Sequence, residues 1–108
     1  MYAQLTYLDG PRTTEEIAAA DFAVRERIAP LVRTLPGVLR VYRMRRVDGS
    51  ELVVSIGESE QALLDVQKAV MTSTLLPGED PALLPGADRV EMYPVIETYD
   101  YAPVASPR

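Results

Sequence analysis

The order of the predicted elements constrains the fold of this chain more than any other feature of its sequence. A long helical pattern ends at Leu35-Pro36-Gly37-Val38, because proline and glycine stop a helix, and an extended segment begins there. A strand and a helix precede this junction, and a hairpin, a second helix and a last strand follow it. The order strand, helix, strand, strand, helix, strand specifies an architecture, but it names no reaction.

The first half of the chain is predicted to contain one strand and one long helix. The strand spans residues 2–8, where the side chains alternate in polarity with the period of two that is typical of a sheet. The helix follows Thr13, which forms a capping box with Glu16. Because proline cannot donate a helical hydrogen bond, we expect Pro30 to kink or split this helix. The apolar residues that it is expected to bury are Ile17, Val24, Ile28, Leu31 and Leu35.

A hairpin follows the junction, with strands predicted over residues 38–47 and 51–57. The turn Val47-Asp48-Gly49-Ser50 fits either a type I′ turn or a type I turn with a glycine bulge. These turns give opposite registers, and a shift of one residue moves every side chain to the other face of the sheet. The sequence therefore leaves open which face carries Tyr42 and which carries Arg43.

A second helix, a long loop and a last strand complete the chain. Ser59 is the predicted cap of the helix, which runs to about Thr72. The loop over residues 75–88 is of a length that is often functional. It is either a lid over a pocket or a packing segment on its own helix or on a partner chain. The last strand spans residues 89–99, where Pro94 favours an edge position.

Two strand-helix-strand halves around a central hairpin predict an α+β fold, the ferredoxin-like βαββαβ arrangement. Right-handed crossovers give an antiparallel sheet of order 4-1-3-2 with both helices on one face. The second and fourth strands are then edges, and charged side chains on an edge hinder indiscriminate pairing. We expect residues 1–101 to form one domain and residues 102–108 to be a flexible tail. The arginines on or just after the second strand are Arg40, Arg43, Arg45 and Arg46.

The face of the sheet away from the helices would be open in a monomer. A half-apolar open face favours a homodimer in which a second copy covers it. The residues of the central strands that we expect on this face are both polar and apolar: Gln4, Thr6, Val53 and Ser55.

With this order of elements, and with a first helix that ends in Leu35-Pro36-Gly37-Val38, the chain resembles the dimeric α/β-barrel superfamily over residues 2–99. That group includes proteins like the antibiotic-biosynthesis monooxygenases, the EthD-like proteins and the stress-responsive barrel proteins. The resemblance implies a homodimer whose two sheets close into a barrel with the helices outside. It also implies a pocket for a small-molecule ligand between the sheet and the helices of each subunit.

The amino-acid composition limits the reactions that this protein can catalyse and the partners that it can bind. The chain has no histidine, cysteine or tryptophan, which excludes thiolate catalysis and removes the commonest general base. Because haem-degrading members of the superfamily use a histidine ligand, and some cyclases a His–Tyr pair, we exclude both activities. The net charge of −5 argues against nucleic acid and anionic membranes as partners. We expect no metal, no cofactor and, since the first residues are strand-like rather than a signal peptide, a cytoplasmic location.

The candidate substrate-binding residues lie on the strands, and no residue is given a catalytic role. Tyrosine hydroxyls and an arginine can bind a polar or anionic substrate, and the polar residues can line a cavity. Each group has a structural alternative: tyrosines as core or interface rings, arginines as edge protection with ion pairs, and polar residues in a partly wet dimer interface. The candidates are Tyr7, Tyr42, Arg43, Tyr93, Gln4, Thr6 and Ser55.

The function that these observations favour is a small, cofactor-independent monooxygenase-like enzyme acting on an aromatic or polyketide-type metabolite. In such chemistry the carbanion of the substrate reacts with dioxygen, so that the protein supplies binding and polar stabilisation. One alternative is a non-catalytic small-molecule-binding or accessory dimeric barrel protein, and others are a polyketide cyclase or isomerase and a structural dimerisation module. The enzyme hypothesis predicts an enclosed apolar pocket with a tyrosine or arginine pointing into it.

Overall fold

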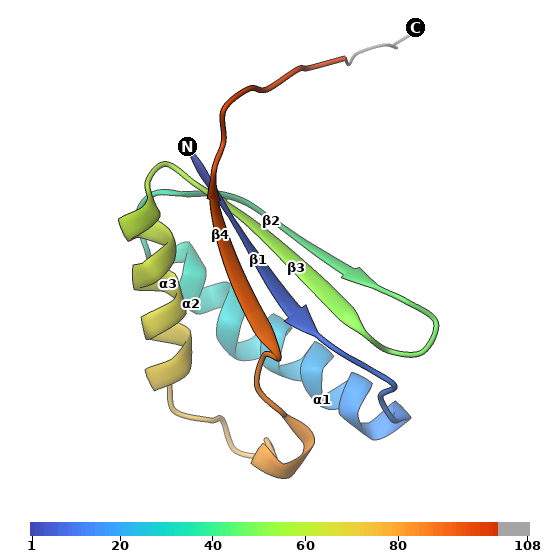
Figure 1. The fold of residues 1–108 in the computed structure, drawn as a ribbon. Coiled ribbons are helices and arrows are strands. Elements are labelled where there is room, and N and C mark those ends of the chain that lie inside the picture. Colours follow the sequence, from blue (N-terminus) through green and yellow to red (C-terminus); the bar gives the residue numbers. More distant parts are fainter. Residues whose placement is uncertain (102–108) are drawn as a thin grey trace, which may run out of the picture.

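The computed structural model describes residues 1–101, and the tail predicted over residues 102–108 lies outside the described part. One antiparallel sheet has the order β2-β3-β1-β4, and the helices lie against one of its faces (Figure 1). The predicted ferredoxin-like fold and strand order 4-1-3-2 are thereby confirmed, with β2 and β4 at the edges. The elements are β1 (Tyr2–Leu8), α1 (Thr14–Ala23), the π-helical turn η1 (Val24–Ile28), α2 (Ala29–Arg33), β2 (Val38–Arg45), β3 (Glu51–Gly57), α3 (Glu60–Thr72), the 3-10 turn η2 (Pro81–Leu83) and β4 (Arg89–Pro94).

The first helix is divided into α1, η1 and α2, and the π-helical turn η1 lies just ahead of Pro30, close to the expected position of the break. The helix begins at the predicted capping box, where the Thr13 hydroxyl accepts the Glu16 N–H and the Glu16 carboxylate accepts the Thr13 N–H. Pro30 has no N–H to donate to the preceding turn, and the wider π turn just ahead of it accommodates the missing bond. The break follows from the sequence, whereas its π geometry does not.

α3 closes the helix side of the core. Its predicted cap is confirmed, since the Ser59 hydroxyl accepts the N–H of Ala62 at 3.1 Å. Leu63 is fully buried against the end of β3, where Gly57 makes room for it: a Cβ at Gly57 would lie 2.8 Å from Leu63 Cγ. Within residues 1–101, the apolar side chains that are fully buried are those of Leu63 and Ala23. Much of the remaining apolar surface is therefore only partly covered by the chain itself.

The β2–β3 hairpin adopts the second of the two predicted turns. Gly49 has a φ of +91°, and no described residue other than glycine has a positive φ. Because a type I′ turn needs positive φ at both central residues, Asp48 excludes it. The Gly49 N–H donates to the Arg46 carbonyl at 3.0 Å, as in a type I turn that ends in a glycine bulge. In this register Tyr42 pairs with Val54, and Arg43 with the preceding residue of β3.

The face of the sheet that the helices cover carries Gln4 and Ser55, which pair across β1 and β3. Gln4 is 5% exposed, and its amide donates to the Gln67 side chain of α3 at 3.1 Å. Alternation along the strands places Thr6 and Val53 on the same face. The expectation that these four strand residues line the open face is therefore wrong. The physical reason is that buried Gln4 is satisfied by a helix residue, which strand alternation by itself does not reveal.

The open face of the sheet is the more apolar of the two. It carries every second residue of each strand, the ones that alternate with the helix-facing set. Tyr42, Met44 and Tyr93 at its margins are each about half exposed, at 47%, 45% and 52%. Its central and marginal apolar residues are Ala3, Leu5, Tyr7, Leu52, Val54, Ile56, Tyr42, Met44 and Tyr93.

The edge strands are shorter than the sequence predicts. β2 ends at Arg45 rather than at residue 47, and β4 ends at Pro94 rather than at residue 99. Pro94 cannot donate to the ladder, and only the Val95 N–H makes a further bond, to the Met1 carbonyl at 2.9 Å. The chain then leaves the body of the molecule, and we call residues 95–101 the arm (Figure 1). Across residues 1–101, no helix combines the length and the apolar character that crossing a membrane requires.

Candidate functional site

The predicted site residues do not form one site, because they divide between the two faces of the sheet. On the helix-covered face lie Gln4, Thr6, Ser55 and Arg43; on the open face lie Tyr7, Tyr42 and Tyr93. Two of these tyrosines are engaged by arginines. The Arg89 guanidinium lies 3.9 Å from the centre of the Tyr7 ring, and an Arg40 N–H donates to the Tyr42 hydroxyl at 3.1 Å.

The helix-covered face holds a hollow between α1 and β2, with a volume of about 120 Å³. Three arginines and two acidic residues line it together with one methionine, so that it is not a purely apolar pocket. We call it the charged hollow; its lining residues are Asp21, Arg25, Arg43, Met44, Arg45 and Glu51.

Arg43 and Arg45 are held in the charged hollow by the same two carboxylates. Arg43 Nη2 lies 3.0 Å from Asp21 Oδ1 and 3.0 Å from Glu51 Oε2. Arg45 Nη2 lies 2.6 Å from each of these oxygens. Glu51 is nearly buried, with 9% of its side chain exposed. Arg43 therefore forms the ion pairs that the sequence analysis gave as its alternative role. Its guanidinium group nevertheless lines the hollow.

Electrostatics favour the ionised form of the Asp21 carboxylate in the charged hollow. The hydrogen bond from Arg45, followed by the one from Arg43, lowers the pKa of Asp21 despite the opposing effect of burial. The same contacts with Asp21 and Glu51 raise the pKa of Arg45. An ionised carboxylate bound by guanidinium groups is a weak base, so this arrangement is suited to holding an anionic oxygen rather than to abstracting a proton.

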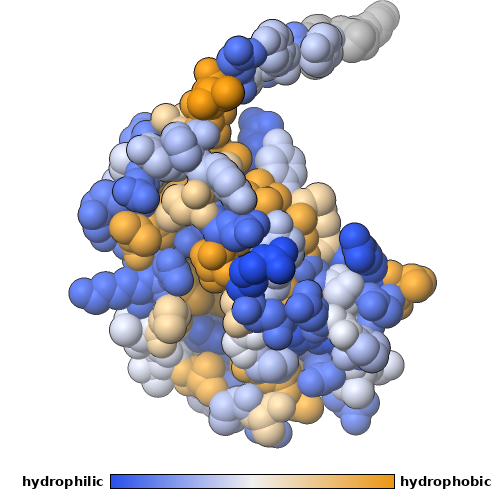
Figure 2. All heavy atoms as spheres, in the orientation of Figure 1, coloured by the Kyte–Doolittle hydropathy of each residue, from blue (hydrophilic) through white to orange (hydrophobic). Residues whose placement is uncertain are grey.

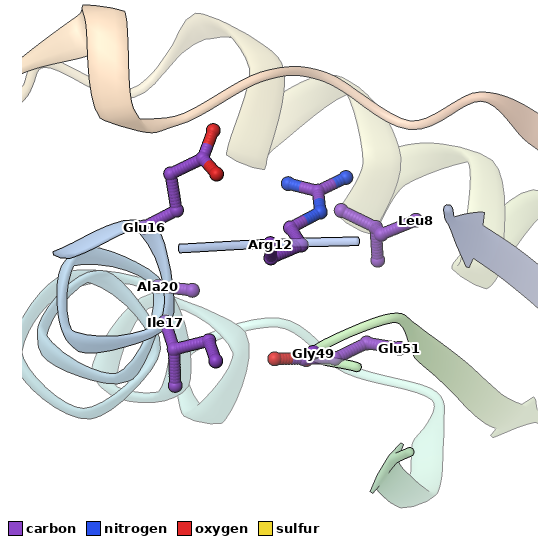
Figure 3. Close-up of a pocket in the computed structure, with 7 residues that line it drawn as sticks. All are labelled: Leu8, Arg12, Glu16, Ile17, Ala20, Gly49 and Glu51. Atoms are coloured by element: carbon purple, nitrogen blue, oxygen red, sulfur yellow. The ribbon is translucent and has the colours of Figure 1, made fainter. Parts of the chain in front are cut away.

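A second, smaller hollow of about 30 Å³ adjoins the first, and Glu51 lines both. Figure 3 shows Ile17 and Ala20 of α1 opposite Gly49 and Glu51 of the hairpin, with Arg12 between the two sides. Its volume suits one or two water molecules rather than an organic ligand. The two hollows together follow the line along which α1 meets the hairpin. The remaining lining residues are Leu8 and Glu16.

A polar patch lies deeper on the same face, between α3 and the central strands. Gln4 and Ser55 are buried, at 5% and 9% exposed, and Gln67 makes the hydrogen bond to Gln4 described above. Gln67 is a residue that sequence reasoning missed. Its spacing of four residues after Leu63 on α3 places it on the inner face of the helix, and that spacing could have identified it.

Asp21, Arg25 and Glu51 are also missing from the residues predicted from the sequence. Glu51 lies directly across the hairpin from Arg45, a contact that only the correct turn register reveals. Asp21 comes from α1 and meets Arg43 through the tertiary fold, for which the sequence holds no local signal. Among residues 1–101, no group of three or more acidic, histidine or cysteine side chains is placed to hold a metal ion.

Comparisons with solved structures establish the fold. MhuD, in a variant with two manganese protoporphyrin IX molecules bound per active site, aligns with a TM-score of 0.67 and 17% identity over 93% of this chain and 99% of that one. A dimeric ferredoxin-like protein from an uncultured marine organism aligns with a TM-score of 0.64 and 9% identity over 94% and 92%. SnoaB, a cofactor-independent oxygenase from Streptomyces nogalater, aligns with a TM-score of 0.52 and 19% identity over 90% and 92%.

No protein-family model matches the chain, and no curated protein matches it at a significant level. The resemblance to the antibiotic-biosynthesis monooxygenase-like and ferredoxin-like superfamily is confirmed at the level of the fold. At identities of 9–19%, these structures show how the chain folds and leave its reaction to be argued from the site.

Proposed function

We propose that the protein is a homodimeric, cofactor-independent oxygenase whose substrate is a small hydroxylated aromatic metabolite, bound as its anion in the charged hollow. The observation that carries this proposal is the position of Arg43. It lines a hollow between sheet and helices, fixed by Asp21 and Glu51, in a fold shared with a cofactor-independent oxygenase. A fixed guanidinium stabilises a phenolate or enolate oxygen, and stabilising that oxygen lowers the free energy of the carbanion form of the substrate.

The size and charge of the hollow limit the substrate. Its volume of about 120 Å³ is somewhat below that of an engineered cavity of about 150 Å³ that holds benzene, so it accommodates roughly one aromatic ring. The enclosed apolar pocket that the enzyme hypothesis predicts is not what lies here, because the lining is charged. A ring that carries an ionisable hydroxyl fits this lining better than an unsubstituted hydrocarbon does.

The reaction balances without a cofactor. The substrate anion loses a proton from an activated CH₂ group to solvent, since the carboxylates of the hollow are held by arginines. The resulting carbanion gives its electrons to dioxygen, a new carbon–oxygen bond forms, and the peroxide anion takes a proton back from solvent to become a hydroperoxide. Loss of water from the hydroperoxide leaves a carbonyl, so that CH₂ and O₂ become C=O and H₂O. The contribution of the protein is binding and charge stabilisation.

The homodimer is supported by the open face of the sheet. Its central residues are apolar and only half-buried in one copy, and one of the structures with this fold is described as dimeric. A contiguous apolar face of this kind is typical of an interface, and a twofold dimer pairs it with itself. Sedimentation is expected to report about twice the monomer mass of 11.9 kDa.

Oxygen uptake with phloroglucinol as a probe tests the enzyme proposal, because this compound is a single hydroxylated ring whose keto tautomer carries activated CH₂ groups. We expect uptake above the uncatalysed rate, with one carbonyl formed per O₂, and a loss of at least about tenfold in Arg43→Met. Arg33→Met is the matched control, because Arg33 is an exposed arginine of α2 that lies outside the hollow. Absence of uptake with phloroglucinol and with other monocyclic hydroxylated aromatic compounds would contradict the enzyme proposal.

A non-catalytic binding protein is the second candidate, and the charged lining favours it, because no carboxylate of the hollow is free to act as a base. It predicts that the same aromatic anions bind, with an affinity that Arg43→Met weakens, while oxygen uptake stays at the uncatalysed rate. Calorimetric titration beside the oxygen electrode distinguishes the two candidates.

A further inference from the structure

The three arginines that line the charged hollow are not held alike. Arg43 and Arg45 share the carboxylates of Asp21 and Glu51, and their side chains are 24% and 31% exposed. Arg25 comes from the π-helical turn η1 and is exposed at the rim. Within residues 1–101, no carboxylate lies within ion-pairing distance of it. The hollow therefore has one guanidinium group that the chain itself does not engage.

The reason is that the nearest acidic residue on the same helix is already occupied. Asp21 precedes Arg25 by four residues, the spacing at which an acidic and a basic side chain usually pair on a helix. Asp21 Oδ1 instead accepts hydrogen bonds from Arg43 at 3.0 Å and from Arg45 at 2.6 Å. The tertiary contacts of β2 thus replace the local pair and leave Arg25 without it.

An exposed arginine is not by itself a binding site. Figure 2 shows strongly hydrophilic residues scattered over the face of the molecule that it presents, and isolated surface charges of this kind are ordinary. Arg25 differs from them because it lies at a hollow whose other charges are paired with one another.

The charges and donors of the hollow define a ligand with two different polar groups. Three arginines against two acidic residues leave one positive charge uncompensated, which a ligand with one negative charge balances. The hydrogen bonds of Arg43 within residues 1–101 all start from Nε or Nη2, so its Nη1 can donate to one oxygen. Arg25 can offer its whole guanidinium fork, which matches the two oxygens of a carboxylate.

We propose that the ligand of the charged hollow is a hydroxylated aromatic carboxylic acid whose carboxylate is bound by Arg25. The inference rests on the function proposed above and narrows its substrate class. Since the hollow accommodates about one ring, the carboxylate projects at the rim, where solvent still reaches it, while a hydroxyl oxygen faces Arg43. The carboxylate stays intact in the reaction, so that Arg25 determines specificity and positions the ring.

A pair of ligands that differ by one carboxylate tests this assignment. Phloroglucinol carboxylate is the phloroglucinol ring with that group added, and calorimetric titration measures the affinity of each. We expect the wild type to bind the carboxylate at least about tenfold more tightly than phloroglucinol. Arg25→Met should reduce this preference to less than about twofold and leave the affinity for phloroglucinol nearly unchanged, because only the carboxylate contacts Arg25.

Two further variants separate a specific contact from a general effect of surface charge. Arg33→Met removes an exposed arginine of α2 outside the hollow and should keep the full preference for the carboxylate. Arg25→Lys keeps the charge but loses the planar fork, so its preference should lie between those of the wild type and Arg25→Met. Equal loss of preference in Arg25→Met and Arg33→Met would overturn the site.

The possible failures are distinguishable. A wild type that binds both compounds equally, or an Arg25→Met variant that keeps the preference, overturns the carboxylate site and leaves the oxygenase proposal to the uptake assay. The expected preferences without any oxygen uptake overturn the oxygenase and leave Arg25 as the carboxylate contact of a binding protein. If neither compound binds, the charged hollow is not the ligand site, and both proposals fall.

Discussion

Arg27 of η1 and Glu79 of the loop after α3 form a two-point ion pair that is almost wholly removed from solvent. Arg27 Nε lies 2.7 Å from Glu79 Oε2, Nη2 lies 3.1 Å from Oε1, and the side chains are 11% and 1% exposed. Arg27 Nη1 also donates to the Ser73 hydroxyl at 2.6 Å, and Glu79 accepts the Leu76 N–H at 2.8 Å. The long loop is therefore a segment packed on its own first helix.

Loss of Arg27 should destabilise the protein. Arg27→Met leaves a nearly buried Glu79 carboxylate without its cation, and we expect the melting temperature to fall by several degrees. Arg33→Met, on an exposed arginine of α2, should leave it unchanged. Thermal unfolding followed by circular dichroism measures both. Equal melting temperatures for the two variants would show that the loop is held by other contacts.

The same pair predicts a pH dependence. The hydrogen bond from Arg27, followed by the Leu76 N–H, lowers the pKa of Glu79 below its ordinary value of 4.5. Since the carboxylate ionises more readily in the folded state, its contribution to stability is present above pH 4.5 and is lost as the pH falls through the folded-state pKa. The melting temperature of the wild type should therefore fall more steeply below pH 4.5 than that of Glu79→Gln. Parallel curves for the two proteins would refute this contribution.

Leu63 and Leu64, one buried and one exposed on the same helix, allow the contribution of the small core to stability to be measured. Leu63 is fully buried, and Leu63→Ala should lower the free energy of unfolding by about 3 kcal/mol through lost contacts and a residual cavity. Leu64 follows it on α3 and is 43% exposed, so that Leu64→Ala should cost less than about 1 kcal/mol. Urea denaturation of both variants checks the difference. Similar costs would mean that the space left by Leu63 collapses.

Gly37, at the junction between the first helix and β2, combines two constraints. Its φ is +89°, and an added Cβ would lie 2.7 Å from the Cβ of Ala62. Gly37→Ala should therefore lower the free energy of unfolding by at least about 2 kcal/mol. Gly78 has a φ of +92° with nothing near its missing side chain, so Gly78→Ala should cost about 1 kcal/mol. The difference between the two losses of stability, measured by denaturant unfolding, is the cost of the clash with Ala62. Equal losses would mean that the positive φ alone accounts for the cost at Gly37.

The fold was predictable because its determinants are local. The capping box at Thr13, the cap at Ser59 and the stop at Gly37 each act within a few residues, and together they set the order of elements. Right-handed crossovers then leave one strand order for that sequence of elements. The early end of β4 is a local error, because Pro94 ends the ladder rather than merely interrupting it.

The site was predictable only in part, because it depends on register and tertiary contacts. One glycine bulge at Gly49 decides that Arg43 faces the helices and Tyr42 faces the open side. The partners that give Arg43 its role, Asp21 and Glu51, come from α1 and from across the hairpin. No local pattern in the sequence encodes these contacts. The tyrosines and the polar residues could therefore be named as candidates, but they could not be assigned to one face of the sheet or the other.

Substitutions at Val53 and Val54 test both the assignment of side chains to the two faces of the sheet and the homodimer. These neighbours on β3 point to opposite faces: Val53, which pairs with Thr6, towards the helices, and Val54, which pairs with Leu5, towards the open side. Val54→Lys should keep a folded circular dichroism spectrum but sediment as a monomer, because its charge would be buried between two apolar sheets. Val53→Lys should lower the melting temperature instead, because it places an ammonium group under the helices. If Val54→Lys still dimerises with unchanged affinity, the open face is not the interface, and the second copy must bind elsewhere.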